Sequence, residues 1–128
     1  MGVELETRIE RRFAQRDRGA PRAARSIVAG LDGVSDDVRC DLTLVVSELV
    51  ANAVRHAPAV DGGEVRLVIV RRHGHVHVEV RDPGRGFDPT PDRTREGGLG
   101  LLTVSRVARE WGIQSGDCTT VWCDLEGD

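Results

Sequence analysis

Hydrophobic and polar positions divide the chain into segments of helical periodicity and segments of strict alternation. Residues 3–13 fit both patterns, because their apolar positions alternate as in a strand and also include the helical spacing of Leu5, Ile9 and Phe13. Pro21 then stands where the first turn of a helix tolerates proline. The apolar residues after it predict an amphipathic helix that ends near residues 30–33.

A longer helix is predicted from Ser35 to Ala57. Ser35 is a typical N-cap residue, and Asp36 and Asp37 place negative charge at the positive end of the helix dipole. Pro58 disfavours helical geometry in the residue before it, so the helix should stop there.

Two strands are predicted next, at residues 64–72 and 75–82, because each segment alternates apolar and polar positions. His73-Gly74 between them is typical of a tight hairpin turn. Residues 83–98 are rich in proline and glycine and should form a loop. A helix is then predicted from Leu99 to Trp111, followed by a closing hairpin of residues 113–115 and 119–125.

The order of these elements predicts an α+β fold, because the strands come as antiparallel pairs and do not alternate singly with helices. We expect a two-layer sandwich, with helices on one face of a mixed, mostly antiparallel sheet. The 128 residues form a single domain, 1–128, which is long enough to bury a hydrophobic core.

The amino-acid composition argues against several classes of protein. A net charge of -3 with a pI near 5.8 argues against a dedicated nucleic-acid binder. Cys40, Cys118 and Cys123 fit neither a zinc site nor a disulfide framework, so free thiols in a reducing cytoplasm are expected. No apolar run approaches the length of a membrane span and no leader pattern opens the chain, so we expect a cytoplasmic protein without membrane contact.

Three polar residues interrupt the apolar pattern of the long helix. At about 100° per residue, His56 falls within the apolar sector, while Glu48 and Asn52 fall at its edge. A buried polar group without a partner is costly, so these side chains need partners. Those partners are either other protein groups, as in a row of core polar side chains that bond one another, or water, a metal ion and a ligand phosphate.

Two glycine-rich segments suggest the ligand. Asp82 ends a strand and is followed at once by Gly84 and Gly86, so its carboxylate can accept from the exocyclic amine of a flat heterocycle that approaches the main chain. Gly97-Gly98-Leu99-Gly100 leads into a helix, whose amides and positive end suit phosphate oxygens. The spacing is not that of a dinucleotide fingerprint, and the chain lacks the lysine of a P-loop.

In this order, the three motifs resemble the GHKL ATPases, which share the Bergerat ATP-binding fold. They are Glu-x-x-x-Asn-x-x-x-His (48–56), Asp-x-Gly-x-Gly (82–86) and Gly-x-Gly-Leu (98–101). Within that superfamily the chain is similar to the anti-sigma-factor serine/threonine kinases of bacterial partner-switching systems. The resemblance covers about residues 20–125 and implies ATP and Mg²⁺ as ligands.

The resemblance also implies a role for individual residues. Asn52 would ligate the Mg²⁺ that bridges the phosphates, and Glu48 would be the general base. Asp82 would read the adenine amine, supported through water by Thr120 on the last strand. The remaining nucleotide contacts that it implies are the glycines beside the base and the residues at the start of the following helix: Gly84, Gly86, Gly98, Leu99, Gly100 and Leu101.

Residues 88–96 would form a lid over the nucleotide. Arg93 or Arg95 in this lid would reach the γ-phosphate, where a guanidinium stabilises the transferring charge. Solvated loop charges are the alternative for both residues. His56 would orient or pack beside the nucleotide and would not act in catalysis.

The leading functional hypothesis is an anti-sigma factor with serine/threonine kinase activity, which would bind a sigma factor and phosphorylate an anti-anti-sigma protein. The resemblance also suggests a homodimer. A nucleotide-dependent binding module without kinase activity is the alternative, and an α+β domain without nucleotide is the third. The short lid and the missing dimerisation helices argue against the catalytic domain of a histidine kinase.

Overall fold

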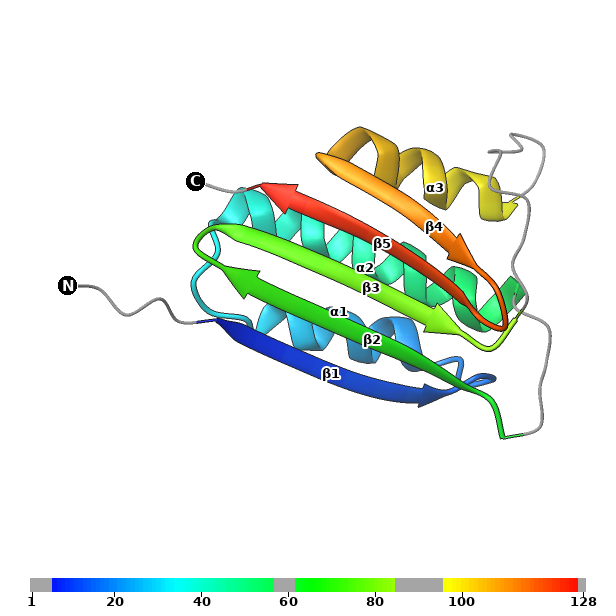
Figure 1. Cartoon of the computed structure of the whole chain (residues 1–128). Helices are drawn as coiled ribbons and strands as arrows, with labels where there is room; N and C mark the ends of the chain where they lie inside the picture. Colours follow the sequence, from blue (N-terminus) through cyan, green and yellow to red (C-terminus); the bar gives the residue numbers. More distant parts are fainter. Residues whose placement is uncertain (1–5, 57–61, 85–95, 127–128) are drawn as a thin grey trace.

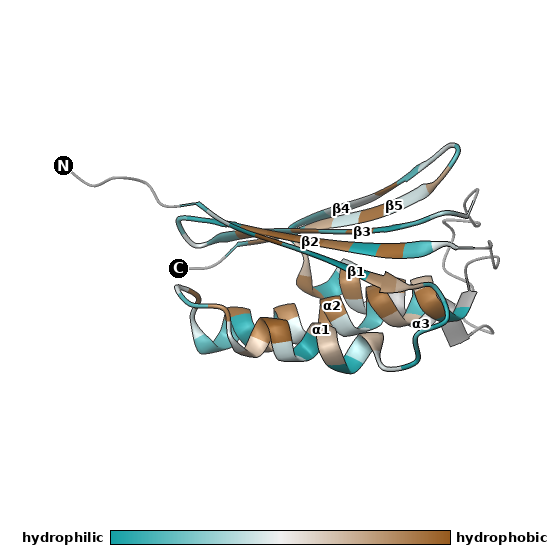
Figure 2. Cartoon of the chain, turned by 90° about the horizontal axis from the view of Figure 1, so that it is seen from below, coloured by the Kyte–Doolittle hydropathy of each residue, from teal (hydrophilic) through white to brown (hydrophobic). Residues whose placement is uncertain are grey.

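The computed structural model describes residues 6–56, 62–84 and 96–126. These residues form two layers, with three helices packed against one face of a five-stranded sheet (Figures 1 and 2). The opposite face of the sheet is not covered by any helix of the described segments. The predicted two-layer α+β architecture is therefore confirmed.

The helices are α1 (Ala20–Ala29), α2 (Asp36–His56) and α3 (Glu96–Val107). Pro21 lies in the first turn of α1, and the Ser35 hydroxyl accepts a hydrogen bond of 3.2 Å from the Val38 amide at the start of α2. Arg39 of α2 donates to the Val28 carbonyl at the end of α1, at 2.8 Å. The two helices are thereby joined by a side chain that satisfies a terminal carbonyl.

The sheet consists of β1 (Thr7–Ala14), β2 (Glu64–Arg72), β3 (His75–Asp82), β4 (Glu110–Ser115) and β5 (Thr119–Glu126). The strand order is β1-β2-β3-β5-β4. Every neighbouring pair is antiparallel, so the expectation of a mixed sheet is corrected to an antiparallel one. His73, in the turn between β2 and β3, has a φ of 52°, as the tight turn requires.

The hydrophobic core lies between the layers. The apolar positions of α2 face the alternate, inward positions of β2, β3 and β5 (Figure 2). Residues that are fully buried there include Leu42, Val45, Val46, Leu67, Ile69, Val76 and Val78. Strand alternation therefore decides which side chains of each strand can reach the helices and which lie on the open face.

Sequence expectations for the first half of the chain agree with the structure. Residues 7–13 of the ambiguous segment 3–13 belong to β1, which ends at Ala14 and pairs along its whole length with β2. The long helix runs to the last described residue before Pro58, and both strands of the first hairpin have the predicted bounds. The N-terminal ambiguity is resolved by pairing with a strand whose partner residues lie 50 or more positions further along the chain, which no local pattern reveals.

Two expectations for the second half are wrong. The predicted helix to Trp111 ends at Val107, and residues 110–115 form β4. Trp111 packs against the core and pairs with Cys123 of β5, so tertiary pairing outweighs the helical periodicity. The predicted loop is also too long, because α3 begins at Glu96 and includes both glycines at 97 and 98.

Candidate functional site

Four element ends meet at one end of the molecule: the ends of α2 and β3 and the beginnings of α3 and β5 (Figure 1). Helix α2 contacts α3, β3 and β5. The described residues of the three sequence motifs lie on these elements or directly after them, so the fold brings residues as far apart in the chain as Glu48 and Leu101 to the same end of the two layers.

Asp82 is the last residue of β3, and its side chain points into the helix-facing layer with only 7% of its surface exposed. Its Oδ1 accepts a hydrogen bond of 2.7 Å from the Gly84 amide. Burial raises the pKa of Asp82, and the hydrogen bond from Gly84 partly opposes that shift. Among the described residues no group bonds Oδ2, so one carboxylate oxygen is available to a ligand donor.

Thr119 stands opposite Asp82 in the β3–β5 register and is completely buried. Its hydroxyl donates a hydrogen bond of 2.9 Å to the Gly84 carbonyl. Asp82 therefore holds the amide of Gly84 and Thr119 holds its carbonyl, which fixes this glycine between two strands. Thr119 is not among the site residues predicted from the sequence.

The predicted role of Thr120 beside Asp82 is corrected by this arrangement. Successive strand residues face opposite sides of a sheet, and Thr119 shares the inward face of β5 with Val121. Thr120 lies opposite Arg81 and belongs to the outer face. The alternation of Thr119, Val121 and Cys123 was visible in the sequence and could have identified the correct threonine.

Glu48 and Asn52 lie one helical turn apart on α2, and both are half-buried. Within residues 6–56, 62–84 and 96–126, neither side chain makes a hydrogen bond or an ion pair. Their neighbours Leu49 and Ala53 are buried in the core, so the two polar groups lie at its border, as the helical wheel predicts. The described residues therefore do not supply protein partners to these two groups, and both are open to water or to a ligand.

The glycines of the third motif lie in the first turns of α3. The first amides of a helix have no partner within the helix, and they form a positive terminus. Leu101, predicted at the nucleotide, is only 3% exposed and its side chain packs in the core, so only its backbone is left for the predicted contact. It lies on the helix side that faces the sheet and α2, as the apolar position of an amphipathic helix does.

Other predicted residues cannot be placed. Gly86, Arg93 and Arg95 and the predicted lid lie outside the described residues, apart from Glu96, which begins α3. His56 is the last residue of α2, but its side chain also falls outside the description, as do the side chains of residues 96–100.

The protein groups fit a magnesium nucleotide better than a metal ion alone. No cluster of three His, Cys, Asp or Glu residues that could hold a metal is present in the described segments. Mg²⁺ usually keeps several waters and binds through one or two protein oxygens plus phosphates. A single amide oxygen from Asn52 is therefore a sufficient protein ligand if the phosphates supply the rest.

Comparison with known protein families identifies the family to which the chain belongs. The family model of the histidine kinase-like ATPase domain matches residues 13–124. The chain belongs to this ATPase family. The match includes the element ends that carry Glu48, Asn52, Asp82 and Thr119, and the family implies ATP as the nucleotide.

Curated relatives narrow the family further. The chain is 33% identical to the serine-protein kinase RsbW of Bacillus subtilis over 118 residues, covering 80% of this chain and 74% of the relative. It is 32% identical to the RsbW of Bacillus licheniformis over 119 residues, with the same coverage of both. RsbW proteins are therefore homologues of this ATPase-family chain.

Solved structures confirm the fold. The RsbU and RsbW domains of Rv1364c from Mycobacterium tuberculosis superpose with a TM-score of 0.70 at 22% identity, over 93% of this chain and 32% of that one. The histidine kinase domain of the blue-light activated EL346 from Erythrobacter litoralis gives a TM-score of 0.58 at 23% identity, over 83% of this chain and 57% of that one. This chain thus spans about a third and just over half of the two solved chains.

The cysteines and the lengths of the helices bear on the cellular environment that the sequence predicts. All three cysteines are free, as expected. None of the helices in the described ranges is long and apolar enough to cross a membrane.

Proposed function

We propose that this protein is a serine/threonine protein kinase and anti-sigma factor that transfers the γ-phosphate of Mg-ATP to an anti-anti-sigma protein. The observation that carries the proposal is the pairing of two unsatisfied polar sites at one end of the fold. One is the free oxygen of the buried Asp82, and the other is the half-buried pair Glu48 and Asn52 on α2. Homology to the serine-protein kinase RsbW supports the reaction class.

The Asp82 end would recognise adenine. The Gly84 amide bonds Oδ1 of the carboxylate and Thr119 holds Gly84 in place, so Oδ2 remains to accept a hydrogen bond from the exocyclic amine of the base. Guanine presents a carbonyl oxygen at that position, and two acceptors facing each other in a buried site repel. The site should therefore prefer ATP to GTP.

The α2 residues would act at the phosphates. Asn52 offers an amide oxygen to Mg²⁺, which when bound would neutralise phosphate charge. Glu48, one helical turn earlier, would accept the proton of the attacking serine or threonine hydroxyl at its carboxylate. The positive beginning of α3 would hold the phosphate oxygens through its free amides.

The protein partners follow from the RsbW relatives. A sigma factor and an anti-anti-sigma protein are the partners we propose, with ATP as the co-substrate. A homodimer stays a prediction of the family resemblance, as does the cytoplasmic location.

Two measurements test the proposal separately. Isothermal titration with Mg-ATP and Mg-GTP should show binding of ATP and weaker binding of GTP, and absence of ATP binding to folded protein would overturn every version of it. Incubation with γ-labelled ATP and anti-anti-sigma proteins from the same genome should then label a serine or threonine.

Matched variants assign the chemistry. Glu48→Gln should retain ATP binding but lose label transfer by at least about 100-fold, the usual contribution of a general base. Asp41→Asn removes one carboxylate from the same helix two turns earlier and should leave transfer unchanged. If ATP binds but wild-type protein never labels an antagonist, the chain is a nucleotide-dependent binding module, and the kinase assignment fails.

A further inference from the structure

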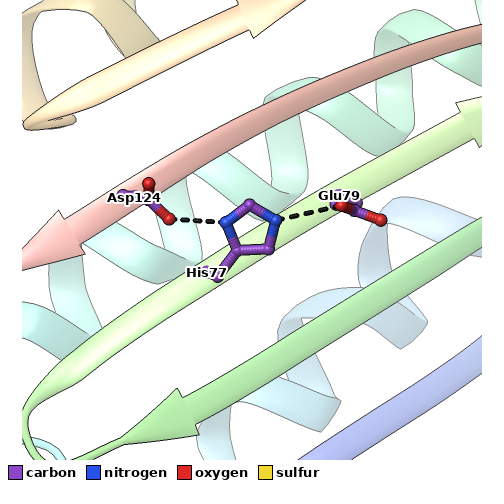
Figure 3. Close-up of polar contacts among 3 residues, drawn as sticks. All are labelled: His77, Glu79 and Asp124. Atoms are coloured by element: carbon purple, nitrogen blue, oxygen red, sulfur yellow. Dashed lines mark hydrogen bonds and ion pairs between the residues drawn. The ribbon is translucent and has the colours of Figure 1, made fainter.

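The open face of the sheet carries a compact ionic cluster around His77 (Figure 3). His77 Nδ1 lies 2.5 Å from Oδ1 of Asp124, and its Nε2 lies 3.0 Å from Oε1 of Glu79. His77 and Glu79 belong to β3, whereas Asp124 belongs to β5 and stands directly opposite His77 in the register. The cluster thus connects two neighbouring strands at a distance from the candidate nucleotide site.

The hydrogen-bonding capacity of imidazole makes this geometry dependent on a proton. A neutral imidazole has one N–H donor and one lone pair, whereas an imidazolium has two donors. Two carboxylates accept and cannot donate when they are ionised. Both ring nitrogens of His77 can therefore bond their carboxylates only when the ring is protonated.

We propose that His77, Glu79 and Asp124 form a proton-dependent clamp between β3 and β5, in which the imidazolium binds both carboxylates and the neutral ring binds only one. The clamp uses residues that the candidate nucleotide site does not include, so it stands independently of the proposed kinase activity.

The surroundings favour the charged ring. Trp122, the next outward residue of β5, stacks against His77 with ring centroids 6.0 Å apart and an interplanar angle of 26°. An aromatic face stabilises a cation at this distance. Burial opposes the charge and is the largest single influence on the pKa of His77, but the hydrogen bonds and charges of Glu79 and Asp124 together raise it above 6.5.

The arginines near His77 are paired with other acids and do not compete with it for Glu79 and Asp124. Val70 faces His77 from β2, and Glu110 of β4 stands opposite Asp124 and adds negative potential. Arg72 lies 2.6 Å from Glu6, and Arg109 lies 3.0 Å from Glu126, so each of these cations has its own acid. The charged and titratable groups that line the hollow beside His77 are Glu6, Arg72, His75, Arg109, Glu110 and Asp124.

The two contacts should not respond equally to deprotonation. The Asp124 contact is the shorter, and it is held by direct cross-strand pairing. Glu79 lies two residues along the same strand, and its side chain is more exposed, at 44% against 38% for Asp124. The neutral ring should therefore keep its proton on Nδ1 toward Asp124 and release Glu79.

Stability should follow the protonation of His77. Its pKa is raised in the folded state, so the clamp is fully formed below the unfolded value near 6.5. Its contribution is lost as the pH rises through the higher folded pKa. The transition therefore lies on the alkaline side of 6.5.

NMR titration of the ring nuclei of His77 in the full chain tests the clamp directly. We expect a midpoint above 6.5 and a neutral ring in the Nδ1–H form. Asp124→Asn and Glu79→Gln should each move the midpoint down, because each removes one charged acceptor. His75→Gln, two residues away on the same strand face, should leave it in place. A midpoint at or below 6.5, or one that neither acceptor variant changes, would overturn the proposal.

A stability measurement gives a second readout. The difference in urea midpoint between wild type and His77→Gln should be largest near pH 6 and should shrink as the pH rises. A difference that is independent of pH would contradict the clamp. If His77→Gln does not fold, the wild-type NMR titration still decides the question.

Discussion

Removal of one hydroxyl group from Thr119 should weaken both the fold and the nucleotide site. Thr119→Val keeps the shape and the branching of the side chain but deletes the hydrogen bond of 2.9 Å to the Gly84 carbonyl. The residue is 0% exposed, so no water can replace the lost donor without a rearrangement. The buried Gly84 carbonyl is then left without its donor.

The expected cost follows from that unpaired carbonyl. Leaving a buried acceptor unsatisfied costs about 1–3 kcal/mol of unfolding free energy. With a urea slope of about 1–3 kcal/mol per molar for a domain of this size, the midpoint should fall by roughly 1 M at an unchanged slope. Gly84 also positions Asp82 through the hydrogen bond of 2.7 Å, so ATP affinity should fall about tenfold, which corresponds to about 1.4 kcal/mol.

Thr120→Val is the matched control, because it makes the same chemical change one residue along the strand. Thr120 lies on the outer face and is half-exposed, so the change should alter stability by less than about 0.5 kcal/mol and leave ATP affinity unchanged. Urea unfolding followed by far-UV circular dichroism, and isothermal titration with Mg-ATP, measure the two effects. Equal effects of the two variants on stability and on affinity would refute the assignment of Thr119 to the Asp82 site.

Three further predictions concern the core, the sheet and the buried acid. Asp82→Asn should be neutral or stabilising at pH 7, because burial raises the pKa of Asp82 and its ionised form is therefore disfavoured in the fold. The same variant should lose ATP binding, and retained affinity for ATP would contradict the adenine assignment. Leu42→Ala should reduce the unfolding free energy by about 2–5 kcal/mol in urea, because Leu42 is completely buried under the sheet, and a loss below about 1 kcal/mol would contradict its place in the core. Gly112→Ala would place a Cβ 2.8 Å from Nε1 of Trp122, so it should cost about 1–3 kcal/mol and alter Trp122 fluorescence; unchanged stability and emission would show that the indole can move aside.

Local patterns in the sequence determined most elements and the nature of the site. Alternation predicted β2 and β3 with their observed bounds, and capping residues with Pro58 predicted α2. The spacing of Glu48 and Asn52 was enough to place both at the border of the buried face, because helix geometry depends only on neighbouring residues. The two glycine-rich motifs led to the prediction that the ligand is a nucleotide.

Features that depend on distant pairing were decided only by the tertiary structure. Residues 110 and 111 were predicted to continue the helix but belong to β4, since β5 offers them antiparallel partners. Alternation along β5 was enough to place Thr119 on the inward face, but only the register between β3 and β5 sets it opposite Asp82. The sequence alone determined which chemical groups the chain carries and the local geometry of α2, β2 and β3. The pairing of distant strands decided the structure of β1 and β4 and which side chains lie opposite one another, because a shift of one residue moves a strand side chain to the opposite side of the sheet.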